Sequence, residues 1–362
     1  MRREAPENRH GGTLTAKARG VFLTAPGVLE ERAFELPELE PGRVIVRVAG
    51  CGLCHTDISF YSGAVKPRHP LPLVLGHEIA GVVEAETGSD EHLVGEAVLL
   101  PAVVPCGRCA LCREGRDTAC TAQFMPGNDG HGGFATAVVA PASHLVRLGT
   151  DLGGHALEEL AVVADAVTTP YQALRRGGVV AGDLVVIVGV GGIGTYGVQI
   201  GRAFGAEVAA IDVDAAKRER ARSLGARWVF DPRETDGRAI RKALASESGI
   251  ASARWKIFEM SGTAKGQELA WSLLAPAATL GVIGFTMDKL AIRLSNLMAL
   301  DATAFGSWGC SPRHYPAVVE LVRPGRVQVA PFIESRPLSE APALFAAQAA
   351  GQHSEKRIIL VP

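Results

Sequence analysis

The chain has 362 residues, which is enough for about two domains. Apolar residues make up 47% and charged residues 21%, proportions typical of a folded globular protein and unlike those of a disordered chain. Lysine and arginine number 37 against 38 aspartate and glutamate, so the formal net charge is −1 and a basic surface for nucleic acid is not expected.

The N-terminal segment, residues 1–20, is polar and lacks the apolar core of a signal peptide. The longest uncharged run covers residues 184–201, a length that could span a membrane as a helix. It contains six glycines, however, and its apolar residues gather at its start, which favours a strand followed by a turn. We therefore expect a cytoplasmic protein with no membrane partner.

The first half of the chain consists of short strand-like segments separated by glycine and proline. The clearest are residues 43–50, 73–85, 97–104 and 134–140. This pattern predicts a mostly β domain, with a twisted and largely antiparallel sheet or a partial barrel. We assign residues 1–167 to this domain and expect residues 306–362, which have a mixed texture, to pack back on it.

The middle of the chain alternates strands with helices. Residues 183–190 form a continuous apolar run, which is typical of a parallel strand covered on both faces. Later strands are expected at 207–214, 227–230, 255–260 and 278–285, with helices at 195–206, 215–226, 238–249 and 266–275. This alternation predicts an α/β fold, with a doubly wound parallel sheet over residues 168–305 that is inserted in the β domain and separated from it by a cleft.

A glycine-rich turn follows the first of these strands. Gly189, Gly191 and Gly194 form a G-x-G-x-x-G pattern between a strand and a helix, the context in which this pattern binds dinucleotides. The first two glycines let the backbone approach a pyrophosphate, and the third lets helix and strand pack closely. Asp212 closes the next strand, where its carboxylate can accept both adenosine-ribose hydroxyls and would repel a 2′-phosphate. We therefore expect NAD rather than NADP.

Four of the seven cysteines are clustered: Cys106, Cys109, Cys112 and Cys120. Four thiolates with this spacing can surround one tetrahedral zinc and leave no position for a substrate, which predicts a structural zinc site. Cys51 and Cys310 belong to no such pattern, and we expect both to be buried thiols.

Cys54 and His77 stand on two neighbouring loops and are candidate ligands of a second, catalytic zinc. Such a site needs about three protein ligands and one open position. The spacing alone leaves two interpretations open, a metal site or two residues with structural roles.

Six sequence motifs occur together in a characteristic order. They are GLCHTD (52–57), GHEIAG (76–81), the four-cysteine cluster, VTTPYQAL (167–174), GVGGIG (189–194) and IDVD (211–214). In these motifs the chain resembles the zinc-dependent medium-chain alcohol dehydrogenases over essentially its whole length. The resemblance implies a Rossmann sheet inserted in a GroES-like catalytic domain, with NAD and two zinc ions per chain. It also implies oxidation of an alcohol by hydride transfer to NAD.

The same resemblance assigns roles around the catalytic zinc. Cys54 and His77 match the first two ligands, and Asp165 stands where many relatives have a cysteine as the third. Glu78 matches a carboxylate that can approach the metal. Asp57 matches an acid that orients the imidazole of His77.

Further roles concern the proton and the cofactor. Thr56 matches the residue that accepts the proton of the substrate hydroxyl. Many relatives pass this proton to a histidine three residues further on, where this chain has Ser59, so water or another histidine must complete the transfer. The cofactor contacts that the resemblance implies are Thr169 near the nicotinamide, Gly192 and Ile193 in the turn, Lys217 near the ribose, and His55 and Arg357 near the pyrophosphate. For the last two, a solvated surface role is the alternative.

One loop indicates the substrate. Residues 123–133, together with 52–78, resemble the family members that oxidise 6-hydroxycyclohex-1-ene-1-carbonyl-CoA, a cyclic secondary alcohol joined to a thioester, in anaerobic aromatic degradation. A CoA ester needs cations for its phosphates. The candidates are Arg68, His69, Arg313 and His314, with ordinary surface charge as the alternative. His131 could contact the thioester carbonyl or complete the proton transfer, and its alternative role is that of a turn residue.

Three other interpretations remain. A dehydrogenase of simple primary or secondary alcohols would share every motif and differ only in its pocket. A zinc-ribbon interaction module is opposed by the near-zero net charge and the adjoining nucleotide fold, and a zinc-free quinone reductase by Cys54, His77 and the cysteine cluster. The resemblance also implies a homo-oligomer, either a dimer or a tetramer.

Overall fold

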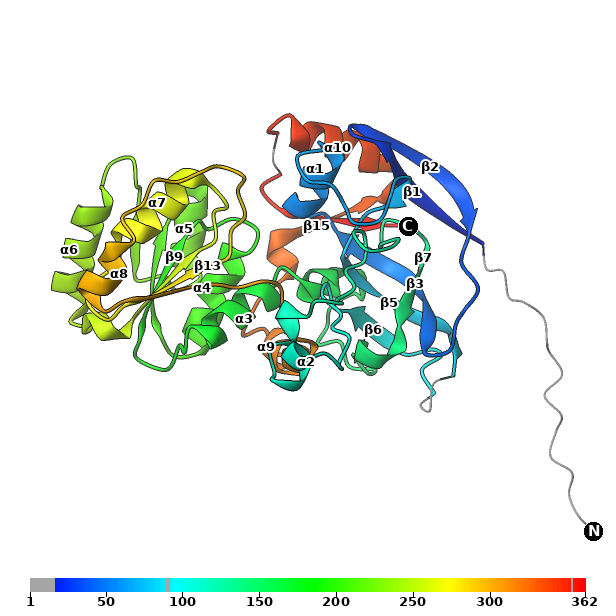
Figure 1. Cartoon of the computed structure of the whole chain (residues 1–362), viewed down its shortest axis with the longest axis horizontal. Helices are drawn as coiled ribbons and strands as arrows, with labels where there is room; N and C mark the ends of the chain where they lie inside the picture. Colours follow the sequence, from blue (N-terminus) through cyan, green and yellow to red (C-terminus); the bar gives the residue numbers. More distant parts are fainter. Residues whose placement is uncertain (1–16, 89–91, 353) are drawn as a thin grey trace, which may run out of the picture.

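The computed structural model describes residues 17–88, 92–352 and 354–362. Figure 1 shows two parts side by side along the long axis, a helix-covered parallel sheet at one end and a mostly β part at the other. The α/β fold class expected from the sequence is confirmed.

The mostly β part contains two sheets. β2 (Val28–Glu35), β1 (Lys17–Ala25) and β4 (Leu73–Val74) form an antiparallel three-stranded sheet. The second sheet has the order β15-β16-β3-β5-β6-β8, with β7 paired to β3. Its strands are β3 (Arg43–Gly52), β5 (Glu78–Thr87), β6 (Ala97–Leu100), β7 (Ala137–Pro141), β8 (Val146–Arg147), β15 (Ile333–Pro337) and β16 (Arg357–Val361). Because β16 pairs with the end of β3, the last strand lies beside the loop that carries Cys54.

This part also contains short helices. They are α1 (His55–Tyr61), α2 (Ala110–Arg113), α9 (Tyr315–Val322) and α10 (Ala341–Ala349), together with a 3-10 segment, Glu158–Ala164. The 3-10 segment runs directly into Asp165 and packs on β3, β5, β6 and β16. Residues from the middle of the chain thereby reach the same region as α1.

The other part is a six-stranded parallel sheet with helices on its faces. The strand order is β11-β10-β9-β12-β13-β14, which places the first strand of the series in the middle. The strands are β9 (Leu184–Val188), β10 (Glu207–Ile211), β11 (Trp228–Phe230), β12 (Trp255–Glu259), β13 (Thr279–Val282) and β14 (Thr303–Gly306). The helices are α3 (Thr168–Arg176), α4 (Gly194–Ala203), α5 (Ala215–Ser223), α6 (Gly237–Ser248), α7 (Ala264–Ser272) and α8 (Ser295–Leu300). This is the Rossmann order, in which ligands bind at the carboxyl ends of the central strands.

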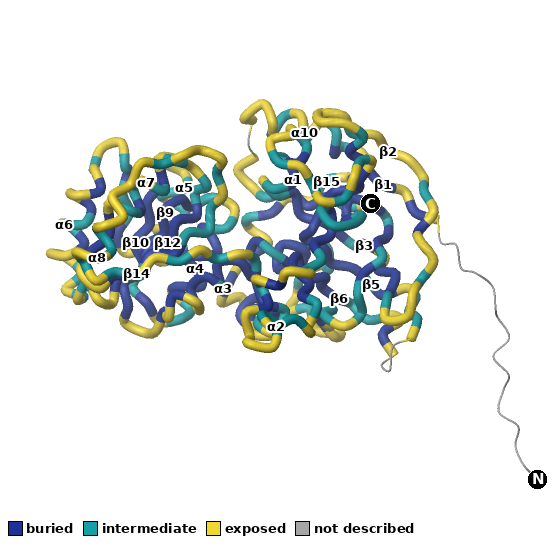
Figure 2. The backbone as a smooth tube through the Cα atoms, in the orientation of Figure 1, coloured by how far each residue is buried: buried dark blue, intermediate teal, exposed yellow. Residues whose placement is uncertain are grey.

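Burial explains why these strands were recognisable. All five residues of β9 are buried, and Figure 2 shows the centre of this sheet as a buried block under exposed helices. A strand covered on both faces gains stability from every side chain, so its sequence is continuously apolar. The uncharged run 184–201 becomes β9, a turn and most of α4. None of the helices in the described ranges is long and apolar enough to cross a membrane.

Several strand limits differ from the predicted ones. The predicted strand 73–85 is divided into β4 and β5, because Gly76 between them has a φ of +99°. The predicted strand 97–104 ends at Leu100, before Pro101, which has no N–H to donate to a neighbouring strand. Six strands were not predicted, namely β1, β2, β8, β14, β15 and β16. Six of the eight residues of β2 are exposed.

One buried cluster joins the two parts. It contains Ala80 and Leu99 from the β sheet, Val185 and Ile187 from β9, and residues of α3, α4 and α9. Tyr315, at the start of α9, is fully buried within it. The parallel sheet is therefore anchored to the β part through a shared apolar core as well as through its two chain connections.

Candidate active site and metal centres

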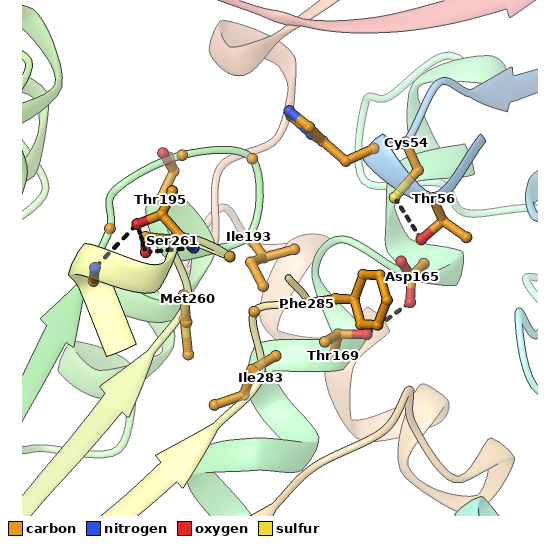
Figure 3. Close-up of a pocket in the computed structure, with 18 of the residues that line it drawn as sticks. Cys54, Thr56, Asp165, Thr169, Ile193, Thr195, Met260, Ser261, Ile283 and Phe285 are labelled. Carbon is orange, nitrogen blue, oxygen red and sulfur yellow. Dashed lines mark hydrogen bonds between the residues drawn. The ribbon is translucent and has the colours of Figure 1, made fainter. Parts of the chain in front are cut away.

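A cavity of about 1260 Å³ lies between the two parts. One side is lined by the carboxyl ends of β9, β10 and β12, and the other by α1 and the loops around His77 and Asp165. Figure 3 shows Cys54, Thr56 and Asp165 on the one side, Thr195 and Ser261 on the other, and Phe285 between them. The predicted dinucleotide turn and the predicted zinc ligands therefore share one cavity.

The glycine turn closes so tightly that side chains are excluded. Gly189 has a φ of +92°, and a Cβ there would lie 2.5 Å from the Cα of Ser261. A Cβ on Gly194 would lie 1.9 Å from the carbonyl oxygen of Gly189. These close contacts explain why the first and last positions of the motif are glycine, since the side chain of any larger residue would force the turn open. Gly191 has open space at its Cβ position, which leaves the backbone accessible to a ligand.

Asp212 follows β10 directly and lines the cavity. Its Oδ2 accepts a hydrogen bond from the Val190 N–H at 2.7 Å, and its Oδ1 accepts one from Asp214 at 2.9 Å. The carboxylate is thus fixed beside the turn, with further lone pairs available for ribose hydroxyls. Lys217 also lines this end of the cavity.

Two arginines flank the turn. Arg357 lies beside Gly192, where a Cβ would approach its Nη1 to 2.6 Å. Arg220, which the sequence analysis missed, donates from Nη2 to the carbonyl of Val190 at 3.1 Å and from Nη1 to the carbonyl of Glu355 at 3.4 Å. It therefore bridges the turn and the C-terminal segment. Its place one helical turn after Lys217 was the signal that could have pointed to it.

Cys54, His77, Glu78 and Asp165 form a compact cluster. Each offers one donor atom, and these four atoms lie within 4.8 Å of one another. A sulfur, an imidazole nitrogen and carboxylate oxygens are donors that zinc accepts. The predicted ligands, which extend from Cys54 to Asp165 in the sequence, are thus brought together.

Asp57 connects the loops that carry Cys54 and His77. Its Oδ2 accepts a hydrogen bond from the Cys54 N–H at 2.9 Å, and its Oδ1 accepts one from the Gly76 N–H at 3.2 Å. The same Oδ1 lies 3.4 Å from Nδ1 of His77, which leaves Nε2 directed toward Asp165 at 3.7 Å. This is the arrangement expected of an acid that orients a ligating imidazole.

The cluster favours positive charge. Burial alone would lower the pKa of His77, but the charge of Asp57 and hydrogen bonds with Asp165, Asp57 and Cys54 raise it well above its usual range. The pKa of Asp165 is lowered, because its interactions with His77 and Thr169 outweigh the effect of burial. Surroundings that hold a proton on a buried imidazole also suit a divalent cation.

Asp165 is held on two sides. Its Oδ1 accepts a hydrogen bond from Thr169 Oγ1 at 2.7 Å, shown as a dashed line in Figure 3. The preceding carbonyl, that of Ala164, accepts a hydrogen bond from the buried hydroxyl of Tyr315. Thr169 also lines the cavity. The family resemblance predicts that the nicotinamide binds beside it.

Glu78 is paired with an arginine as well as lying near the other donors. Arg357 donates to both of its carboxylate oxygens, at 2.7 Å from Nε and also from Nη2. Burial raises the pKa of Glu78 to about 7, although Arg357 opposes this shift. With Glu78 paired to Arg357, the donor atoms of Cys54, His77 and Asp165 are those that could hold a zinc ion, which would leave a fourth position for the cavity.

The proton-transfer candidates differ in their surroundings. The hydroxyl of Thr56 lies 3.8 Å from Sγ of Cys54 and lines the cavity. Ser59 also lines the cavity, but its hydroxyl donates to the carbonyl of His55 at 3.0 Å. Thr56 is therefore placed at the predicted ligands, and Ser59 is partly committed to its own helix.

The four-cysteine lobe forms the second candidate metal centre. Cys106, Cys109, Cys112 and Cys120 place their sulfurs within 4.8 Å of one another. Backbone hydrogen bonds from Arg108 and Cys109 are the main reason that the pKa of Cys106 is lowered to about 6, and burial is the main reason that the pKa of Cys112 is raised to about 12. Four sulfurs alone fit a structural zinc. Cys51 and Cys310, as expected, are buried free thiols.

Three of the candidate CoA-binding cations do not line the cavity, and neither does His131. His131 accepts a hydrogen bond from the Val74 N–H and packs against the rings of Phe22 and Phe34. It is therefore not placed to contact a thioester carbonyl or to complete the proton transfer, and its alternative, a structural role in its loop, fits these contacts. Arg313 pairs with Asp117 in the cysteine lobe. His69 and His314 are likewise absent from the cavity lining, whereas Arg68 belongs to it.

Comparison with known proteins agrees with this geometry. Residues 40–150 match the alcohol dehydrogenase GroES-like domain, and residues 192–323 match the zinc-binding dehydrogenase domain. An alcohol dehydrogenase of Geobacillus stearothermophilus is 30% identical over 321 residues, covering 88% of this chain and 91% of the relative. The chain belongs to the zinc-dependent medium-chain alcohol dehydrogenase family. It is therefore an oxidoreductase of the alcohol dehydrogenase type, and an isolated zinc-ribbon module is excluded.

Solved structures of this family are similar throughout. Galactitol-1-phosphate dehydrogenase of Escherichia coli has a TM-score of 0.86 and 25% identity, with 95% of this chain and all of that chain covered. A proposed zinc-binding dehydrogenase of Sinorhizobium meliloti, solved with NADP bound, has a TM-score of 0.85 and 25% identity, with 96% of this chain and all of that chain covered.

The geometry of Asp165 leads to a direct prediction. Replacing Asp165 with Ala removes one of the three candidate zinc donors. We therefore expect the protein as purified to contain one zinc per chain instead of two, and turnover to fall by at least about 100-fold. Metal content by mass spectrometry and the initial rate provide the two measurements. Asp151→Ala, on an exposed turn, is the matched control and should retain both ions. An Asp165→Ala protein with two zinc ions and full turnover would show that Asp165 is not a ligand.

Proposed function

We propose that this dehydrogenase uses NAD and a zinc ion held by Cys54, His77 and Asp165 to oxidise a cyclic secondary alcohol carried on a CoA thioester. The observation that supports it most is the meeting of these three donors at a cavity that the glycine turn also lines. We further propose that residues 168–305 form the cofactor-binding domain and that residues 1–167 and 306–362 form the catalytic domain. A second zinc in the four-cysteine lobe completes the set of proposed cofactors.

Each residue at the site has a separate role in the proposed reaction. A zinc ion held by Cys54, His77 and Asp165 would act as a Lewis acid on the alcohol oxygen, and a nicotinamide bound at the glycine turn would accept the hydride. Thr56, beside Cys54, is placed to accept the hydroxyl proton. Asp57 keeps His77 in one orientation, and Thr169 keeps Asp165 in place. The cavity lining also includes the apolar side chains of Ile283 and Phe285.

The proposed choice of NAD depends on Asp212. Its carboxylate lines the cavity at the end of β10, where an adenosine ribose is held in this fold. A 2′-phosphate would place a second negative charge against it. The similar structure from Sinorhizobium meliloti contains NADP, and we propose that this chain differs from it in its cofactor.

The proposed CoA substrate has support from residues at the cavity. Arg68 lines it and pairs with Asp129 at 3.2 Å, and Lys66 two positions earlier also lines it. Cations at this side would suit the phosphates of CoA. Oxidation of simple alcohols is the second candidate, supported by the similarity to the Geobacillus stearothermophilus alcohol dehydrogenase.

One assay separates these possibilities. The purified enzyme is given 6-hydroxycyclohex-1-ene-1-carbonyl-CoA, cyclohexanol or ethanol, each with NAD and with NADP, and reduced nicotinamide is followed by absorbance. We expect kcat/KM for the CoA ester with NAD to exceed every other combination by at least about tenfold, a difference that corresponds to about 1.4 kcal/mol. A preference for ethanol or cyclohexanol would support the second candidate, and a preference for NADP would overturn the cofactor assignment.

We also propose that two copies associate through β14. This strand is last in the sheet order, and three of its four residues are exposed. The residues that lead to it include Met287, Leu294 and Met298, which are exposed by 68%, 67% and 78%. An open strand edge beside exposed apolar side chains suits a symmetric pairing.

Sedimentation equilibrium tests this association. The protein should have two or four times the chain mass, and Met298→Lys should shift it toward the monomer because the lysine would be brought close to its symmetry mate. Lys265→Met provides a control outside the proposed contact. A monomer at micromolar concentrations would contradict the proposal.

A further inference from the structure

The four-cysteine lobe contacts the segment that connects the parallel sheet back to the β part. This return segment, residues 307–314, follows β14 and precedes α9. Asp117, between the third and fourth cysteines of the lobe, is only 7% exposed. Its buried carboxylate faces the return segment rather than solvent.

The contact consists of charged and neutral hydrogen bonds. Ser311 Oγ donates to Asp117 Oδ2 at 2.6 Å, and Ser311 is itself buried. Arg313 Nη2 lies 3.1 Å from the same oxygen and also donates to the carbonyl of Gly115 at 3.1 Å. Hydrogen bonds to a buried charge contribute more than neutral ones, so this contact fixes Ser311 against the lobe.

The return segment is also a wall of the cavity. Ser307, Trp308 and Gly309 line it, and a Cβ on Gly309 would lie 2.7 Å from Cγ2 of Val103, another lining residue. The wall is therefore packed tightly just before Ser311. A displacement of Ser311 is expected to move Gly309 and Trp308, because a single residue, Cys310, separates Ser311 from Gly309.

A second contact connects the same serine to the proposed zinc ligand Asp165. The Ser311 N–H donates to Oε1 of Gln172 on α3 at 3.3 Å. The same helix carries Thr169, which bonds Asp165. Ser311 thus lies between the lobe on one side and the helix that positions Asp165 on the other.

We propose that Asp117 is a positioning residue that connects the four-cysteine lobe to the return segment. Through this connection, the conformation of the cavity wall at 307–309 depends on whether the lobe holds its metal. The lobe has little core of its own, since its helix α2 has four residues and none is buried. Its shape therefore depends on metal binding. The inference rests on the zinc proposed for this lobe, and it does not require the proposed substrate.

Hydrogen exchange of the full-length, zinc-loaded protein tests the coupling without turnover. Ser311→Ala removes the buried hydroxyl from this contact and leaves the pairing of Arg313 with Asp117, so the protein should retain two zinc ions and exchange its amides at 307–314 about tenfold faster. Asp117→Asn should show the same increase. Cys112→Ser removes one of the four cysteines proposed to hold the lobe zinc. When this variant contains zinc only at the catalytic site, its amides at 307–314 should exchange faster by the same factor. Glu114→Gln, an exposed charge change in the same lobe, is the matched control.

A spectroscopic signature distinguishes wall movement from general destabilisation. Trp308 is 49% exposed and lines the cavity, so its emission, obtained by subtracting the spectrum of Trp308→Phe, reports on the wall. Acrylamide should quench this component more strongly in Ser311→Ala and Cys112→Ser than in wild type. Unchanged exchange and quenching in Ser311→Ala, or equal changes in Glu114→Gln, would overturn the proposal. An enzyme inactive toward the CoA ester would leave these measurements unaffected.

Discussion

The structure depends on bringing a thiol, an imidazole and two carboxylates together in a buried space. Such groups repel or lose hydration when they are buried without partners. Here Thr56 lies 3.8 Å from the thiol of Cys54, and Asp57 lies 3.4 Å from the imidazole of His77. Thr169 donates a hydrogen bond to Asp165, and Arg357 donates to Glu78. The partners hold the donors in place, and a divalent cation would balance the charge that remains.

Arg357 gives this arrangement a second consequence. The same side chain that occupies Glu78 lies against Gly192 in the dinucleotide turn. Arg220 adds a bridge from the other side of the turn to Glu355, two residues before Arg357. The cofactor turn and the metal cluster are therefore connected through the last strand of the chain. Hydride transfer depends on the relative position of cofactor and substrate, so this connection suits an enzyme that holds both in one cavity.

The local sequence was sufficient for features that depend on neighbouring residues. β9 is continuously apolar because both faces are covered, and the glycines of the turn have no room for a side chain, so both could be read directly. The cysteine cluster is equally local. β2 was not predicted because its exposed face carries charged residues. β14 was not predicted because a short edge strand has little periodicity in its sequence.

Contacts between distant positions could not be read in this way. The pairing of Glu78 with Arg357 joins residues 279 positions apart, and only the resemblance gave each of them a role. The expectation for His131 was wrong because aromatic rings from β1 and β2 surround it, which its own glycine-rich loop does not show. The contact of Asp117 with Ser311 spans 194 positions and had no sequence signal.

Metal removal and replacement test the central claim most directly, that a cation at Cys54, His77 and Asp165 is required beside a bound nicotinamide. Enzyme treated with a chelator until only the lobe ion remains should still bind NADH, as followed by nicotinamide fluorescence, but should lose at least about 99% of its turnover. One equivalent of zinc should restore the rate. Undiminished oxidation of the alcohol by enzyme with an empty catalytic site would contradict the account.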